Sequence, residues 1–190
     1  MKLLAVIPLA ALALTPLLAA DNLGTLIFQD DFNRTESQEK TDEPGNGWTT
    51  NSKARAKDDK QVDLRNGAMH IHLSPRADHA VSVAHAAEFT DGAVALRFKL
   101  EDARDSLGLD FADLAFKDVH AGHLFAARVS PKQVQLQDLA TGNMRLDISE
   151  ARKAKTKLTE EQQKALVGKN KNVPAALALN QWHDLLVKIS

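Results

Sequence analysis

The chain has 190 residues, of which 26% are charged and 44% are hydrophobic, and its formal net charge at pH 7 is −1. This near balance of charge argues against nucleic acid or an anionic membrane surface as a partner. The chain contains no cysteine, which excludes a disulfide framework and a cysteine-linked lipid anchor, so its core has to be held by burial alone.

The first segment, MKLLAVIPLAALALTPLLAA (1–20), predicts a secretory signal peptide. Lys2 gives a short positive start, an apolar stretch follows, and small residues end the segment at Ala20. The alternative, an uncleaved membrane anchor, is disfavoured by the short length and by Pro8 and Pro16. We therefore expect a periplasmic or extracellular location and no stable membrane insertion after cleavage.

The most distinctive polar stretch of the chain covers residues 28–51. Two adjacent acids, Asp30 and Asp31, precede Arg34, and a Gly-Asn-Gly turn leads into Trp48. Calcium is a hard cation that prefers carboxylate and carbonyl oxygens, so the two acids are a candidate metal site. The alternative is that they cap this segment and pair with Arg34. Calcium is a possible cofactor, and the sequence leaves the cofactor otherwise unknown.

Short segments of alternating apolar and polar residues follow, separated by turn signals. Asn66-Gly67, the strongest short hairpin signal, separates predicted strands over 61–64 and 68–73. Asp91-Gly92 is expected to join strands over 80–89 and 93–100 in the same way. Further strands are predicted over 132–139, 144–149, 173–179 and 182–190. Such spacing is typical of an antiparallel sandwich or barrel, so residues 21–190 are predicted to form one all-β domain.

The alternation also predicts which side chains of these strands face the core. The expected inward set is Val94, Leu96, Phe98, Leu100, Val134 and Leu136, and the expected outward set is Arg97, Lys99, Gln133, Gln135 and Gln137.

One segment, 149–171, breaks the strand pattern because it is rich in Ala, Lys, Glu and Gln. Thr159, with Gln162 three residues later, resembles a capping box and predicts a short helix near 159–167. The basic run over 151–157 is interpreted as a solvated face, with a polyanion patch as the alternative.

Three blocks of the sequence resemble one known family: FQDDFNR…GNGW, QVDLRNGAMHIHL…AVALRFKL, and LDFADL…VHAGHLFAARV. They look like secreted bacterial proteins of the 3-keto-disaccharide hydrolase domain family, within the concanavalin A-like lectins and glucanases. The resemblance implies a jelly-roll sandwich and a carbohydrate or glycoside partner. The closing QWHDLLVKI is similar to a sandwich strand that further strands follow in such proteins. The resemblance therefore also implies that the last strands of the sandwich are missing.

Glycoside hydrolysis needs two carboxyl groups on either side of one bond. The nearest acid pair is Asp110 and Asp113, which would face opposite sides of a regular strand unless a bulge intervenes. His120 and His123 flank a turn-like Gly122 that would let both imidazoles approach one point. These four acids and histidines are the candidate catalytic residues, and the alternative is that the acids are solvated near strand ends.

Four further side chains are candidates for ligand binding: His79, His85, Arg97 and Arg128. The two histidines would complete a metal or acid–base site if they met Asp110 or Asp113. The arginines would bind sugar hydroxyls or a sugar acid. The chain has no Tyr and two Trp residues, which gives few aromatic platforms for sugar rings. We predict a secreted domain that acts on carbohydrate in the manner of a glycoside hydrolase; the alternative is a non-catalytic carbohydrate-binding or cell-surface interaction module.

Overall fold

The computed structural model describes residues 23–190, so the predicted signal peptide lies outside the described residues. The chain divides into two compact units. Unit 1 comprises Met1–Gly92 with Ile189–Ser190, and unit 2 comprises Ala93–Lys188. Within residues 23–190, no helix has the length and apolar character needed to cross a membrane.

Unit 1 contains four short strands and one short helix within its described residues. They are β1 (Thr49–Thr50), α1 (Ser52–Arg55), β2 (Val62–Arg65), β3 (Ala68–Ile71) and β4 (Val83–Ala84). β2 and β3 form an antiparallel hairpin, and β1 pairs antiparallel with β4. At the hairpin turn Asn66 and Gly67 have φ angles of 54° and 66°, the left-handed values that a type I′ turn requires. The predicted Asn-Gly hairpin is confirmed.

Buried polar groups hold the centre of unit 1 together. Gln61 is completely buried, and its side-chain amide donates to Ser52 Oγ and accepts from the Ser74 backbone N–H. Asp42 accepts from the backbone N–H groups of Gln61 and Val62 at 2.7 and 2.9 Å. Buried polar groups are tolerated when they are hydrogen-bonded in this way.

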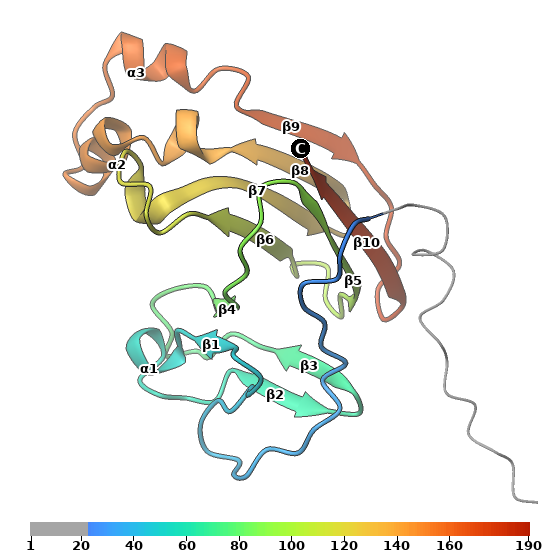
Figure 1. The fold of residues 1–190 in the computed structure, drawn as a ribbon. Helices are drawn as coiled ribbons and strands as arrows, with labels where there is room; N and C mark the ends of the chain where they lie inside the picture. Colours follow the sequence, from blue (N-terminus) through green and yellow to red (C-terminus); the bar gives the residue numbers. More distant parts are fainter. Residues whose placement is uncertain (1–22) are drawn as a thin grey trace, which may run out of the picture. The chain divides into compact units, whose positions relative to one another are not determined.

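Unit 2 is dominated by antiparallel strands. Its elements are β5 (Gly92–Lys99), β6 (Leu107–Ala112), η1 (His120–Gly122), β7 (His123–Ser130), β8 (Gln133–Asp138), η2 (Leu139–Asn143), α2 (Leu146–Lys153), α3 (Glu160–Ala165), β9 (Asn170–Pro174) and β10 (Trp182–Ile189). Strands β6-β7-β8-β9 form a four-stranded antiparallel sheet, and β5 pairs with β10. Figure 1 shows β9 at an edge of the larger sheet and α2 and α3 at one end of it. The described chain is thus mostly strand in antiparallel sheets, as the all-β prediction requires.

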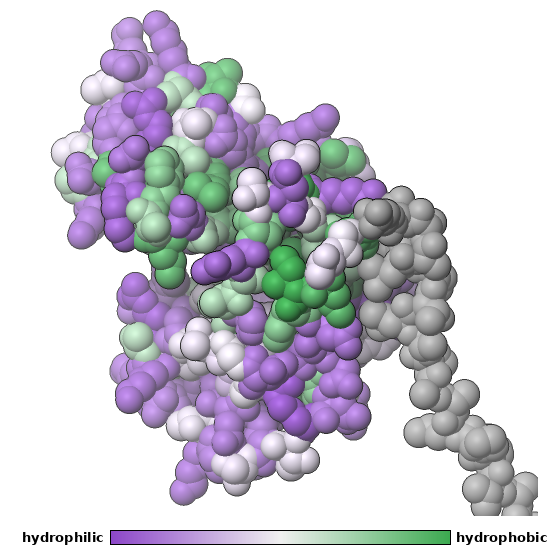
Figure 2. All heavy atoms as spheres, in the orientation of Figure 1, coloured by the Kyte–Doolittle hydropathy of each residue, from purple (hydrophilic) through white to green (hydrophobic). Residues whose placement is uncertain are grey.

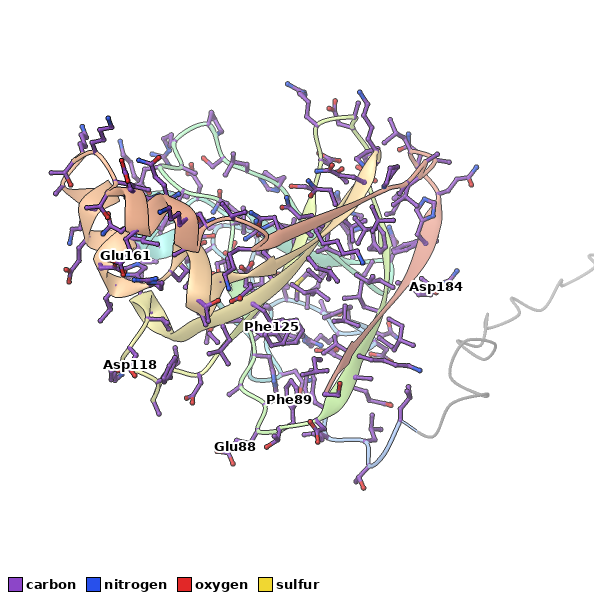
Figure 3. The ribbon with its side chains drawn as sticks, turned by 90° about the horizontal axis from the view of Figure 1, so that it is seen from above. Glu88, Phe89, Asp118, Phe125, Glu161 and Asp184 are labelled. Atoms are coloured by element: carbon purple, nitrogen blue, oxygen red, sulfur yellow. The ribbon has the colours of Figure 1, made fainter. Side chains whose placement is uncertain are left out.

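The apolar core of unit 2 joins its two sheets. Phe98 and Leu100, in and just after β5, pack with Val129 of β7, and all three are buried. Partly buried apolar residues surround them: Leu96, Leu107, Val134, Leu177 and Leu185. Phe125 of β7 stacks on Phe111 of β6 with ring centroids 4.5 Å apart, whereas Asp184 points outward from β10 (Figure 3). The predicted inward alternation of β5 is confirmed, because Phe98 and Leu100 are buried and Arg97 is exposed.

Two predicted strands are replaced by other structure. The hairpin expected between 80–89 and 93–100 is absent from the described residues, since β4 covers only Val83–Ala84 and pairs with β1, while β5 pairs with β10. The prediction of a strand over 144–149 is wrong, because Met144 and Arg145 lead directly into helix α2. Helix formers follow Ile148, and only one isolated bridge, Val119 to Arg145, remains of the extended pairing.

Two smaller predictions also need correction. Residues 175–179 lie outside β9, which runs from Asn170 to Pro174. The N–H groups of Ala175 and Leu177 donate instead to the Lys132 and Pro131 carbonyls, in the turn that precedes β8. Leu136 was expected to face the core, but 51% of it is exposed. It shares a sheet face with Val134, and the core cluster reaches Val134 without extending to Leu136.

The predicted capping box is confirmed at the start of α3. Thr159 Oγ1 accepts from the Gln162 N–H, and the Gln162 side chain accepts from the Thr159 N–H. Residues 152–157 of the basic run are exposed, and hydrophilic side chains dominate the surface over α2 and α3 that Figure 2 shows. This agrees with the interpretation of the run as a solvated face.

Candidate functional site

The outward face of the four-stranded sheet in unit 2 is built from polar side chains that lie opposite one another. Strand register places Gly108, Arg128, Gln135 and Asn172 in one row across β6 to β9. The next row contains Asp110, Ala126, Gln137 and Asn170. Because side chains alternate between faces, the Gln-x-Gln and Asn-x-Asn spacings bring these amides to the same side.

A hydrogen-bond network runs through these rows across all four strands. Arg128 Nη2 donates to Asp110 Oδ1 at 3.0 Å, and Arg128 Nε donates to Gln137 Oε1 at 2.6 Å. Gln137 Nε2 then donates to Asn170 Oδ1 at 3.1 Å. A parallel bond joins Gln135 Nε2 to Asn172 Oδ1 at 2.8 Å. Planar groups fixed in this way present their remaining donors and acceptors in defined directions.

Gly108 leaves the space in which the Arg128 guanidinium lies. A Cβ atom at position 108 would sit 2.7 Å from Arg128 Nη1 and 3.3 Å from Asp110 Oδ2. The absence of a side chain on β6 therefore lets the guanidinium cross the neighbouring strand and reach Asp110.

An open pocket of about 390 Å³ lies where this face meets α2. Its lining residues are His120, Arg128, Gln137, Leu139, Asn143, Met144, Ser149 and Arg152. The side chains of Arg128 and Gln137 come from the sheet, and those of Ser149 and Arg152 from the helix. Its volume falls within the roughly 300–1,000 Å³ that is usual for small-molecule sites, but it is open to solvent rather than enclosed.

Several polar groups in this pocket have no partner within residues 23–190. Arg128 and Gln137 are bonded as described, but the side chains of His120, Asn143, Ser149 and Arg152 make no hydrogen bond or ion pair with the described chain. Polar groups held together but left unpaired are available to a ligand.

The predicted catalytic residues are only partly brought together. Asp110 belongs to the network on β6, whereas Asp113 lies beyond the strand, after a register shift between Phe111 and Ala112, and accepts the Ala115 N–H. His120 lines the pocket, and its predicted catalytic role stays a prediction. His123 begins β7, and its Nδ1 atom is buried without a hydrogen-bond partner in the described residues.

The tight turn between these two histidines depends on Gly122. It has a φ of +71°, and a Cβ atom there would lie 2.1 Å from the Asp113 carbonyl oxygen. The turn-like role expected of this glycine is confirmed.

The two predicted arginines lie on different sheets of unit 2. Arg128 is at the centre of the polar network, whereas Arg97 is on β5 and pairs with Asp184 of β10 at 3.1 Å. Lys99 pairs with Glu101 and lies 5.9 Å from the centre of the Trp182 ring. Arg97 thus takes part in a surface ion pair of the smaller sheet.

In unit 1, hydrogen bonds from nearby residues satisfy both oxygens of the Asp30 carboxylate. Oδ1 accepts from the Phe32 N–H and Arg34, and Oδ2 accepts from Asn46 and the Trp48 indole, at 2.7 to 3.0 Å. Burial alone would raise the pKa of Asp30, but these hydrogen bonds, led by the one from Arg34, hold the pKa well below its ordinary value. The pairing with Arg34 is the alternative that the sequence left open, and calcium would have to displace these donors.

Asp31, the second predicted metal ligand, has a different environment. It is exposed, and its Oδ1 accepts only the Asn33 N–H at 2.9 Å. Such a local turn is typical of aspartate in loops. The two adjacent carboxylates therefore have different surroundings and different hydrogen-bond partners.

The predicted ligand-binding histidines His79 and His85 also lie in unit 1. His85 stacks on Phe28 with ring centroids 3.6 Å apart and meets Trp48 edge-on at 5.2 Å, so it packs as an aromatic residue. Its Nδ1 atom is buried and unpaired within the described chain. His79 is exposed. Because Asp110 and Asp113 belong to unit 2, the expected convergence of these groups stays a prediction.

A cluster of three acids, Glu36, Glu39 and Asp63, is also present in unit 1. Lys60 Nζ lies 2.8 to 3.0 Å from a carboxylate oxygen of each. Burial alone would lower the pKa of Lys60, but hydrogen bonds to Glu39, Glu36 and Asp63 raise it above its ordinary value. The ammonium group already supplies the positive charge that such a cluster attracts.

The sequence did not single out the residues that complete the pocket. Ser149 and Arg152 come from a predicted strand end and from the basic run interpreted as a solvated face, and Asn143 lies between two predicted strands. Gln135 and Gln137 alternate with apolar residues, and this pattern predicts that their amides face outward. The pattern does not indicate which other residues lie beside these amides. No family model, curated protein or solved structure matches the chain.

Proposed function

We propose that this protein is a carbohydrate-binding module whose ligand lies on the polar face of β6 to β9 and enters the pocket beside α2. The observation that carries the proposal is the network from Asp110 through Arg128 and Gln137 to Asn170, which continues into a pocket with unpaired polar groups. A sugar offers many hydroxyls that both donate and accept, and side-chain amides do the same.

The pocket supports binding more than hydrolysis. Hydrolysis needs two carboxyl groups about 5 to 10 Å apart around one bond. The described lining of the pocket contains no carboxylate, and Asp110 is the one acid bonded to a lining residue, Arg128. A glycoside hydrolase activity therefore rests on the family resemblance alone.

The proposal includes the location that the first twenty residues predict. A signal peptide would export the protein to the periplasm or beyond, where polysaccharides and their fragments are available as ligands. The lack of cysteine is compatible with this location, because the two cores described above are held by burial and hydrogen bonds.

Isothermal titration of the purified protein with neutral and acidic oligosaccharides tests the proposal. We expect saturable binding without release of reducing ends. Arg128→Ala should weaken the affinity about tenfold or more, since hydrogen bonds to charged groups are worth about 1.5–3 kcal/mol.

The matched control for this test is Arg97→Ala. Both arginines are exposed, lie on strands of unit 2 and pair with one aspartate, but only Arg128 belongs to the polar network. The control should retain wild-type affinity. Absence of binding to the whole panel, or equal losses in both variants, would refute the proposed site.

A further inference from the structure

Two arginines line the same pocket in opposite states. The Arg128 guanidinium is held by Asp110 and Gln137. The Arg152 guanidinium has no ion pair or hydrogen bond with residues 23–190. Arg128 is thus positioned and largely neutralised, whereas Arg152 brings an uncompensated positive charge to the lining.

The sequence of α2 explains why Arg152 stays unpaired. Helical neighbours lie three and four positions away, and these positions hold Ser149 and Ile148 on the N-terminal side. The acids of the helix are elsewhere: Asp147 pairs with Arg145, and Glu150 is exposed two positions before Arg152. Helix α2 therefore has no acidic residue three or four positions from Arg152 that could form an ion pair with it.

From this arrangement we infer that the pocket selects a sugar that carries a carboxylate, a uronate residue of an acidic glycan, and that Arg152 binds the acid group. A planar guanidinium matches a carboxylate through two parallel hydrogen bonds. Asn143 and Ser149 add neutral hydrogen-bonding groups from the same lining. The inference rests on the proposed function, since it specifies the ligand of the same site.

The last turn of a helix favours a cation whatever the ligand, and α2 ends with both Arg152 and Lys153. Lys153 shares that position and is exposed, but it does not line the pocket. Lys153→Gln is therefore the matched control for Arg152→Gln, since each removes one positive charge from the same turn.

The test compares oligogalacturonate with its methyl ester, which has the same sugar chain without the charge. Titrations would use the purified wild-type protein, Arg152→Gln and Lys153→Gln. We expect the wild type to bind the acid at least about tenfold more tightly than the ester. Arg152→Gln should remove this preference, because it should weaken binding of the acid much more than binding of the ester. Lys153→Gln should keep the preference.

The outcomes separate this inference from the proposed function. Equal binding of acid and ester by the wild type would overturn the inference and leave a carbohydrate-binding module. Loss of preference in Lys153→Gln to the same extent would show a general charge effect and also overturn it. Tighter binding of a sulfated oligosaccharide than of the uronate would refute the carboxylate assignment. Absence of binding to acid, ester and every neutral sugar would overturn both proposals.

Discussion

Asp30 in unit 1 and Arg152 in unit 2 show two ways in which this chain treats a charged side chain. Only 4% of the Asp30 side chain is exposed, and four donors from nearby residues occupy its two oxygens. Arg152 lines an open pocket and has no partner in the described chain. A saturated buried charge contributes to stability, whereas an unpaired charge in a pocket is free to bind.

The same contrast distinguishes the acidic cluster of unit 1 from the polar face of unit 2. The acidic cluster of unit 1 is filled by Lys60, so its three carboxylates already have a cation. The polar face of unit 2 is fixed by Arg128 but keeps free groups at its rim. Changes in the first region should therefore alter stability, and changes in the second should alter binding.

The largest effect is expected from Lys60→Met. It would leave Glu36, whose side chain is 2% exposed, as a buried carboxylate without its counter-charge. Removing one partner of a buried pair costs about 3–5 kcal/mol. Chemical denaturation should show this loss, while sugar affinity stays unchanged. Lys40→Met, at an exposed lysine without an ion pair in the described chain, is the control and should change stability by less than about 0.5 kcal/mol.

Asp30→Asn should give the next largest effect. The asparagine amide keeps one acceptor oxygen, but its NH₂ group replaces the other. The donors that bonded to that second oxygen of Asp30 then have no acceptor. We expect a loss of about 2 kcal/mol in the free energy of unfolding, measured by denaturation at pH 7. Asp31→Asn changes the neighbouring exposed acid and should cost less than about 0.5 kcal/mol. Equal losses in the two variants would contradict the contrast between these acids.

Acid should narrow the gap between wild type and Asp30→Asn. The folded-state pKa of Asp30 is lowered, so its stabilising contribution is fully present above the unfolded-state pKa of about 3.9. It is lost progressively as the pH falls below that value towards the folded-state pKa. The variant has no such titration. Denaturation curves between pH 7 and pH 2.5 should therefore converge, and a constant difference would show that the charge of Asp30 is not responsible.

The parts of the fold that the sequence predicted are those that short-range chemistry determines. Asn66-Gly67 supplies both left-handed residues of a hairpin turn, and Thr159 with Gln162 supplies both halves of a cap. Val187 and its alternating neighbours form the last strand, β10, as expected. For the turn and the cap, the residues that make the structure lie within a few positions of one another, whereas β10 shows a local alternation but pairs with the distant β5.

Predictions that depended on a distant partner were less successful. Met144, Leu146 and Ile148 alternate like a strand, but pairing within the described chain stops at the isolated bridge between Val119 and Arg145, and helix α2 forms instead. The Asp30 donors were partly foreseen through Arg34, which is four residues away, but not through Trp48. The pocket joins a helix to a sheet, so Arg152 had no local signal that distinguished it from an ordinary basic surface residue.

The smallest and most selective effect is expected from Gly108→Ala. The new Cβ would come within 2.7 Å of Arg128 Nη1, the mobile end of a long side chain, so the guanidinium can move away from Asp110 at little cost. Alanine in a strand is also more stable than glycine by about 0.5–1 kcal/mol. We therefore expect unchanged or slightly higher stability together with a several-fold loss of sugar affinity.

A double-mutant cycle decides whether this loss passes through Arg128. In an Arg128→Ala background the added methyl group has no guanidinium to displace, so Gly108→Ala should produce no further change in affinity. Additive losses in the double variant would mean that the methyl group blocks the ligand directly. Unchanged affinity in Gly108→Ala would mean that the position of the guanidinium over β6 does not matter for binding. We predict that Gly108→Ala reduces binding without loss of stability, and only while Arg128 is present. This result would show that the polar face of β6 to β9 contributes to ligand recognition independently of folding.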